Sequence, residues 1–195
     1  MPAAVKNEVS PNSRENILAA ATRVAMARGY GGLNFRNLAE QVGIKSASMY
    51  YHFPSKADLG AAVARRYWQD SAAALAAMQA GTLNPLHCLH DYPGIFRRSL
   101  ESDNRLCLGS FMAAEYDDLP ETVKAEVQTF ADVHVAWLAH MLCAAAVTPT
   151  DRSTARAQAI YAAVAGAQLM ARSRSDILLF DTLIESYRAA GLLPA

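Results

Sequence analysis

The chain has 195 residues, of which 52% are hydrophobic and 18% are charged, and its formal net charge is zero. This length and apolar content allow one sizeable buried core. No apolar run approaches the roughly 20 residues that a membrane-spanning helix needs. The N-terminal sequence MPAAVKNEVSPNS is polar and has no signal-peptide core. We therefore expect a cytoplasmic protein.

The three cysteines do not suggest a disulfide framework, because their number is odd, and their spacing is not that of a metal site. Reduced thiols fit the same cytoplasmic location. His87, Cys88 and His90 lie close together, but no second cluster of ligands accompanies them. We expect neither a metal site nor a cofactor.

The charge is divided unevenly along the chain. Residues 1–66 carry nine basic and four acidic side chains, a net charge of +5, whereas residues 67–195 have a net charge of −5. A basic N-terminal region can neutralise nucleic-acid phosphates while an acidic remainder is held away from them. Chance asymmetry is the alternative, because small domains vary in charge by several units.

Alanine is abundant and β-branched runs are few, which favours an all-α fold. Residues 1–12 are expected to form a disordered arm. A first helix is predicted from Ser13, a typical N-cap, to Gly29, a typical C′ residue. Further helices are expected at 35–41 after Asn34 as cap, at 46–53 with Ser46 as cap, and at 56–79 with Ser55 as cap.

The rest of the chain also has helical periodicity, and the predicted total is about nine helices. A helix at 85–101 is expected to be interrupted near Tyr92-Pro93-Gly94, because proline and glycine break helices. The remaining predicted helices occupy 105–116, 117–146, 153–172 and 176–190. Pro120 suits a first-turn position, with acidic residues near the positive end of the helix dipole.

The segment FRNLAEQVGIKSASMYYHFPSK, from Phe35 to Lys56, contains two short helical patterns separated by Gly43. The second pattern is unusually polar and aromatic, which is typical of a helix-turn-helix whose second helix lies in a DNA groove. Met49 and Phe53 fall on its inward face and are expected in the core. The candidate DNA-binding residues are Asn34, Arg36, Lys45, Ser46, Ala47, Ser48, Tyr50, Tyr51, His52 and Lys56.

These residue types suit different contacts with DNA. Small Ser and Ala side chains let a helix approach the base edges, whereas Tyr50 and His52 are more suited to phosphate. Lys56 at a helix N-terminus places a cation and free backbone N–H groups beside a phosphate. The alternative for Tyr50 is packing in the core, and the alternative for Lys45 is a solvated surface charge.

The run from Ile17 to Tyr67 resembles the TetR family of transcriptional repressors. The matching segments are ILAAATRVAMARGYGGLNFRNLAEQVGI and SASMYYHFPSKADL, whose spacing from Gly29 to Lys56 fits that family without a gap. The resemblance implies a helix-turn-helix domain at 13–56 and a helical effector-binding and dimerisation domain at 57–195. The family often has a glycine after Lys45, where this chain has Ser-Ala-Ser, so the operator sequence stays open.

The resemblance also implies that the last two helices, at 155–171 and 176–190, pair with those of a second copy. Packing within one chain is the alternative. The expected effector pocket has a mixed aromatic and apolar lining with few polar groups, which suits a small amphiphilic molecule. Its candidate residues are His90, Phe96, Cys107, Phe111, Tyr116, His134, Trp137, Met141, Tyr161 and Gln168.

Cys107 has two interpretations. The segment RLCLGSFMAAEYDDLPETVKAEV resembles a TetR subgroup that responds to electrophiles, including NemR-like and acrylate-responsive repressors, in which a cysteine at this place can be a sensor. Arg105 and the positive end of a helix would favour the Cys107 thiolate. The alternative is a small, buried, apolar residue.

Together these observations predict a homodimeric repressor that binds a palindromic operator and releases it when a small-molecule effector enters the body. A ligand-independent DNA-binding or nucleoid-associated protein and a transcriptional activator are the alternatives. An enzyme is not expected, because the sequence offers no Ser/His/Asp order, phosphate-binding glycine loop or paired metal motif.

Overall fold

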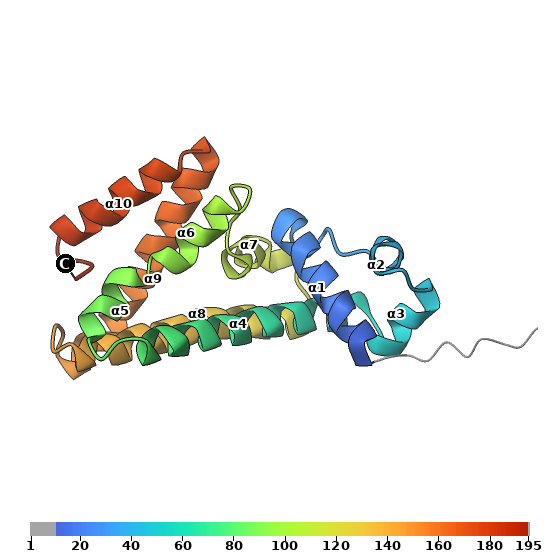
Figure 1. Cartoon of the computed structure of the whole chain (residues 1–195), viewed down its shortest axis with the longest axis horizontal. Coiled ribbons are helices and arrows are strands. Elements are labelled where there is room, and N and C mark those ends of the chain that lie inside the picture. The colour runs from blue at the N-terminus through green and yellow to red at the C-terminus, as the bar shows by residue number, and fades with distance from the viewer. Residues whose placement is uncertain (1–10, 195) are drawn as a thin grey trace, which may run out of the picture.

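The computed structural model describes residues 11–194, so the predicted disordered arm lies almost entirely outside the described residues. Residues 11–194 form ten α-helices, one short 3-10 helix and no strand, which confirms the all-α prediction. No helix of this part of the chain combines the length and apolar character needed to cross a bilayer. The molecule is elongated, with α1 to α3 at one end and the longer helices extending away from them (Figure 1).

The N-terminal end, which we call the head, consists of α1 (Pro11–Arg28), α2 (Phe35–Val42) and α3 (Ser46–His52). Asn34 caps α2 as predicted, since its Oδ1 accepts a hydrogen bond of 3.1 Å from the backbone N–H of Asn37. Gly43 ends α2 with a φ of 76°, a left-handed conformation that glycine adopts without strain. This turn sets the angle between α2 and α3.

Two predicted helix starts in the head are wrong. Lys45, rather than Ser46, has the extended N-cap conformation of α3, and its side chain makes no capping hydrogen bond. In α1, the described residues 11–13 are already helical, so this helix starts before the expected cap at Ser13.

A long helix, α4 (Lys56–Ala80), runs from the head into the rest of the molecule and lies beside α8 (Glu121–Ala144) (Figure 1). Its predicted cap is confirmed, because the Ser55 Oγ accepts a 3.1 Å hydrogen bond from the backbone N–H of Asp58. Leu59 and Val63 of α4 are buried in the same core as the head residues and Val123 of α8. The division at residue 56 stays a prediction, since this core continues across it.

Together with α4 and α8, the remaining helices form the part that we call the body. They are α5 (Pro85–Asp91), α6 (Gly94–Glu101), α7 (Leu108–Ala114), the 3-10 helix η1 (Tyr116–Asp118), α9 (Thr150–Arg174) and α10 (Ile177–Ala189). The expected interruption at Tyr92-Pro93 separates α5 from α6, which accounts for ten α-helices in residues 11–194 instead of about nine.

The helices predicted at 105–116 and 117–146 are shorter than expected. Asp103 and Asn104 have φ angles of 59° and 53°, so the chain turns sharply and α7 starts only at Leu108. Pro120 has a ψ of 150° and is the N-cap of α8, which excludes residues 117–119 from that helix. A second core in the body contains buried side chains of α5, α6, α8, α9 and α10.

Candidate DNA-binding surface and effector site

Helix α3 is fixed in the head by two apolar side chains and exposes the rest of its surface. Met49 is 0% exposed and Phe53 is 2% exposed, which confirms both as core residues. On the other side of the helix, Tyr50 is 59% and Tyr51 is 74% exposed. Lys45, Ser46 and Ala47 are exposed as well, so a continuous polar and small-residue surface faces solvent.

Tyr50 combines both of its predicted environments. Its ring centroid lies 4.9 Å from that of Phe35 on α2, so part of the ring packs within the head while more than half of the side chain stays accessible. Ser48 is only half-buried and borders this surface. The aromatic contact holds the start of α2 against α3, which orients the exposed face of α3.

His52 and Lys56 are less free than the sequence suggested. The His52 Nε2 is enclosed without a hydrogen-bond partner among the described residues, and His52 lines a hollow of about 470 Å³ with Arg14 and Arg65. Lys56 Nζ lies 4.6 Å from the ring centroid of Tyr30 and donates a 3.3 Å hydrogen bond to the Gly31 carbonyl. Lys56 therefore joins α4 to the turn that follows α1.

Asn34 and Arg36 lie at the start of α2 and are both exposed. The Asn34 Oδ1 is engaged in capping α2, whereas the Arg36 side chain extends from the surface without a hydrogen bond or ion pair inside residues 11–194. The head thus presents the short, accessible helix α3 beside the start of α2, which carries the cationic side chain of Arg36. This is the geometry of a helix-turn-helix DNA-binding domain.

Comparisons with known proteins identify this head. The family model of bacterial regulatory proteins, tetR family, matches residues 17–63. Over 43 residues the chain is 44% identical to the HTH-type transcriptional regulator LmrA of Bacillus subtilis (strain 168), a match that covers 22% of this chain and 23% of that protein. The curated relative is thus matched over less than a quarter of its length.

Solved structures extend the likeness to nearly the whole chain. A TetR transcriptional regulator from Legionella pneumophila is 28% identical, with a TM-score of 0.84 over 94% of this chain and 98% of that one. A transcriptional regulator of the TetR family from Agrobacterium tumefaciens is 29% identical, with a TM-score of 0.81 over 88% and 93%. The chain belongs to the TetR family. It is therefore a transcriptional regulator with a DNA-binding head, and not an enzyme.

The reduced form of E. coli NemR has the same fold as this TetR-family chain. It is 23% identical, with a TM-score of 0.81 over 91% of this chain and 96% of that one. Such a likeness concerns the fold alone.

The body of this regulator has an aromatic cluster around His134, which is 0% exposed. One nitrogen of its ring, Nε2, lies 2.8 Å from the Ser71 hydroxyl on α4, and the other, Nδ1, lies 3.0 Å from the Tyr92 hydroxyl after α5. Burial lowers the pKa of His134 to about 4, so the imidazole is neutral at pH 7. One ring nitrogen therefore donates and the other accepts.

Other aromatic rings surround this histidine. Ring centroids of Phe96, Phe130 and Tyr161 lie 5.7, 4.5 and 5.8 Å from that of His134. Trp137 stacks on Tyr92 with its centroid 5.8 Å away, and its Nε1 is buried without a partner among the described residues. The structure thus brings together four of the predicted effector residues, which are Phe96, His134, Trp137 and Tyr161.

Gln168 and Cys107 adjoin the cluster through backbone contacts. Gln168 is 0% exposed; its Nε2 donates to the Phe96 carbonyl at 2.6 Å and its Oε1 accepts from the Cys107 N–H at 3.2 Å. Both ends of this amide are therefore satisfied. Gln168 ties the start of α7 to α6 and α9.

The environment of Cys107 contradicts the expected stabilisation of its thiolate. The side chain is 2% exposed, and burial raises the pKa of the thiol even though it caps α7 and contacts Ser110. Arg105 pairs with Asp103 at 3.0 Å rather than with the sulfur. The loss of hydration on burial thus raises the pKa of the thiol by more than the hydrogen bonds at the helix N-terminus lower it. Cys107 therefore has the character of a buried apolar residue.

The other predicted effector residues lie outside the aromatic cluster. Phe111 is half-buried, with the Arg172 guanidinium 5.2 Å from its ring centroid, and Tyr116 is 38% exposed. Met141 is buried in the same body core as Phe96 and Phe130, whereas His90 is exposed and lies 3.1 Å from the Asp91 carboxylate. Sequence reasoning missed Ser71, because one serine in an alanine-rich helix carries no distinct signal.

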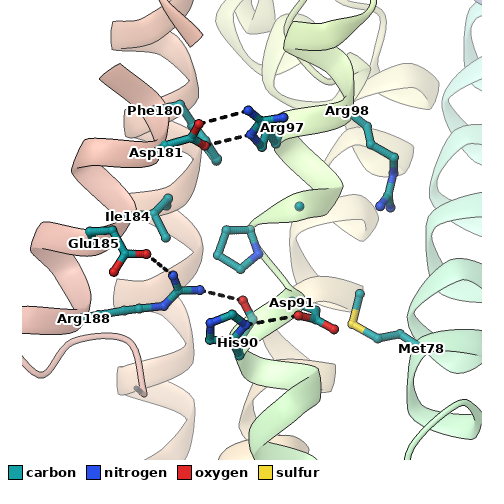
Figure 2. A pocket seen from close by; sticks show the side chains of 12 residues that line it. Met78, His90, Asp91, Arg97, Arg98, Phe180, Asp181, Ile184, Glu185 and Arg188 are labelled. Carbon is teal, nitrogen blue, oxygen red and sulfur yellow. Dashed lines mark hydrogen bonds and ion pairs between the residues drawn. The ribbon is translucent and has the colours of Figure 1, made fainter. Parts of the chain in front are cut away.

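Several hollows open on the body surface. A groove of about 550 Å³ lies between α5, α6 and α10, where Arg97 makes hydrogen bonds of 2.7 and 3.0 Å to the Asp181 carboxylate (Figure 2). Figure 2 also shows Arg188 bound to Glu185 and to the His90 carbonyl. A smaller hollow of about 270 Å³ includes Ser71 in its lining, next to the aromatic cluster.

No group of three or more His, Cys, Asp or Glu side chains within residues 11–194 is arranged to hold a metal ion.

Proposed function

We propose that this TetR-family regulator is a homodimeric repressor that binds a palindromic operator and releases it when a small molecule enters the body. The exposed face of α3 carries the proposal, because Met49 and Phe53 fix the helix while Tyr51 is 74% exposed. A single head of this size reads only a short half-site, so specific binding needs two heads on successive major grooves.

The DNA contacts proposed for each side chain of the head follow from how accessible that side chain is. Lys45, Ser46, Ala47 and Tyr51 at the exposed face of α3 would reach base edges and nearby phosphates. The proposed backbone contacts surround this face and come from Asn34, Arg36, Ser48, Tyr50, His52 and Lys56. The head at 13–56 is thus assigned to DNA and residues 57–195 to the effector and the partner copy, in the cytoplasm where operator DNA is located.

The surface of α9 and α10 supports pairing with a second copy. Leu169 is 57%, Met170 is 42% and Leu178 is 69% exposed in the single chain. Ala159 and Gly166 on the same helix as Leu169 are also exposed and small, which allows close helix approach. Exposed apolar side chains gathered on two adjacent helices are typical of an interface.

The aromatic cluster supports a neutral, aromatic effector. Within the described residues, His134 is neutral and its neighbours Phe96, Trp137 and Tyr161 carry no charge, so an ion would lose its hydration without gaining a partner. The buried Trp137 Nε1 has no acceptor in the part of the chain that the structure describes, and a carbonyl or ether oxygen of a ligand would supply one. The hollow beside Ser71 is the proposed entry.

Effector release would then be a shift of populations. A molecule inserted among these packed rings must separate helices of the body, and it favours a conformation whose heads no longer match successive major grooves. Transcriptional activation and effector-independent binding are the two alternatives, and each predicts a different response to the effector.

A mobility-shift titration with DNA flanking the protein's own gene, at several salt concentrations, tests the proposal. We expect specific binding by the wild type and roughly 5- to 150-fold weaker binding by Tyr51→Ala, since a contact to a base is worth about 1–3 kcal/mol. Lys45→Ala should also weaken binding and reduce the salt dependence, because each phosphate contact releases about 0.9 counterions.

Leu83→Ala is the matched control, because Leu83 is fully exposed in the body. Equal binding of specific and unrelated DNA by the wild type would contradict a sequence-specific repressor. Specific binding that no neutral aromatic compound weakens would favour the effector-independent alternative.

A further inference from the structure

The turn between α1 and α2 is bound by a carboxylate from the body. Among residues 11–194 the backbone N–H of Tyr30 has no helical partner, and it donates a 2.8 Å hydrogen bond to the Glu115 Oε2, 85 residues further along the chain. Glu115 is half-buried and lies between α7 and η1. Hydrogen bonds to a charged acceptor are stronger than neutral ones, so this contact favours one position of the turn relative to α7.

The neighbouring glycine is shaped around this contact. Gly29 has a φ of 65°, and a Cβ added there would overlap the Glu115 carboxylate. Position 29, which precedes the donor Tyr30, therefore needs glycine for two reasons. Its backbone has a positive φ, and the Glu115 carboxylate occupies the space that a Cβ would need.

The same turn is held from the other side by α4. The Tyr30 ring packs so closely over Gly60 that a Cβ at that position would overlap it, with Val123 of α8 next to both. Lys56 lies over the Tyr30 ring and donates to the Gly31 carbonyl. The turn after α1 is thus the place where α4, α7 and α8 meet the head.

Helix α7 connects this turn to the aromatic cluster. Near its start, the Cys107 N–H is bound to Gln168, and Gly109 lies against the Phe130 ring, where a Cβ would overlap the ring. At its end is Glu115. A seven-residue helix is about 10 Å long, so a shift of α7 at the cluster displaces the carboxylate relative to the Tyr30 N–H.

We propose that Glu115 is a positioning residue that sets the orientation of the head relative to the body, and that α7 transmits the state of the aromatic cluster to it. The transmitting role rests on the proposed effector response, whereas the positioning role does not. Opening the cluster would shift α7, lengthen the hydrogen bond to Tyr30 and free the head to change its distance from the partner's head.

Amide hydrogen exchange of the full-length protein tests the positioning role. Glu115→Ala should speed exchange of the Tyr30 amide at least about tenfold, because its acceptor is lost. Glu115→Gln keeps an oxygen acceptor and should give a smaller effect. Asp118→Ala is the matched control, since Asp118 is exposed on the adjacent η1 and its side chain has no hydrogen bond within the described residues.

The distance between the two heads is a second measurement. It would stay unchanged if Glu115 only stabilised the fold. Spin labels at Arg23→Cys, which is exposed on α1, in a Cys143→Ser background would report the separation of the two heads in the dimer. Glu115→Ala should broaden the distance distribution at unchanged melting temperature of the body, and Glu115→Gln should largely restore the wild-type width.

Wild-type exchange at Tyr30 and a wild-type distance distribution in Glu115→Ala would overturn the proposal. So would equal effects of Glu115→Ala and Asp118→Ala. If the alanine variant does not fold, Glu115→Gln and Gly29→Ala, which displaces the same carboxylate, decide the question. Neither measurement needs DNA or an effector, and amide exchange does not need the dimer either, so failure of operator binding or of dimerisation would count against the repressor function and not against this contact.

Discussion

Tyr92 and His134 share a 3.0 Å hydrogen bond in the centre of the body, between residues that are 42 positions apart in the chain. Both side chains are fully buried. This polar pair inside an aromatic cluster makes the body sensitive to the protonation of one imidazole.

Acid should destabilise the fold through His134. The unfolded chain binds this proton near pH 6.5 and the folded chain only near pH 4, because burial lowers the pKa. The contribution of the neutral imidazole is complete above pH 6.5 and is lost as the pH falls toward 4, by about 3 kcal/mol. Urea unfolding of the wild type at pH 7.5, 5.5 and 4.5 measures this loss.

His134→Gln should be less stable at pH 7.5 but should lack this part of the pH dependence. His140→Gln is the control, because His140 lies on the same helix and is exposed. Parallel pH profiles for the wild type and His134→Gln would contradict the assignment.

The thiol of Cys107 should be inert in the native protein. It is 2% exposed and burial raises its pKa, so the reactive thiolate is scarce at neutral pH. Cys143 is half-buried and should react first with iodoacetamide. Mass spectrometry of the alkylated native protein distinguishes the two sites, and rapid labelling of Cys107 at pH 7 would restore the electrophile-sensor interpretation.

Leu178→Glu should convert the proposed dimer to monomers. The side chain is 69% exposed in the single chain, and a charge placed in an apolar interface costs several kcal/mol. Sedimentation velocity over a range of concentrations measures the change. Leu83→Glu, at a fully exposed site outside α9 and α10, should leave the oligomeric state as it is; a dimeric Leu178→Glu protein would place the interface elsewhere.

Gly109→Ala should lower the free energy of unfolding by about 1–3 kcal/mol, because the new methyl group overlaps the Phe130 ring and forces the core to shift. Gly94→Ala is the matched control, since a Cβ at that helical position meets nothing within 4 Å. Chemical denaturation of both variants gives the comparison, and equal stabilities would show that Phe130 moves aside at no cost.

The head was predictable because local rules decide its elements. Asn34, Gly43 and Ser55 act on backbone groups within three residues, so their roles follow from the sequence alone. Even there, one capping residue differs: the cap of α3 is Lys45, since nothing in the local sequence distinguishes a capping serine from a first helical serine.

The body site was only partly predictable because its contacts join distant residues. The sequence predicted Phe96, His134 and Tyr161 as effector-site candidates, but nothing local shows that Ser71 meets His134 from 63 residues away or that Glu115 meets Tyr30. Cys107 illustrates the opposing effects: its place at a helix start was predicted, yet the neighbours that bury it come from other helices. Burial, which sets its pKa, is a property of the tertiary fold.

Gln168 and Leu169 are adjacent in α9, yet one is 0% exposed beside the aromatic cluster and the other is 57% exposed on the proposed dimer face. Helix α9 therefore belongs to both sites at once. If a molecule that repacks the inner side of this helix alters the dimer dissociation constant, thermodynamic linkage requires that dilution alters the affinity for that molecule in turn. Protein concentration would then be a regulatory variable, with effector sensitivity depending on how much of the regulator a cell contains.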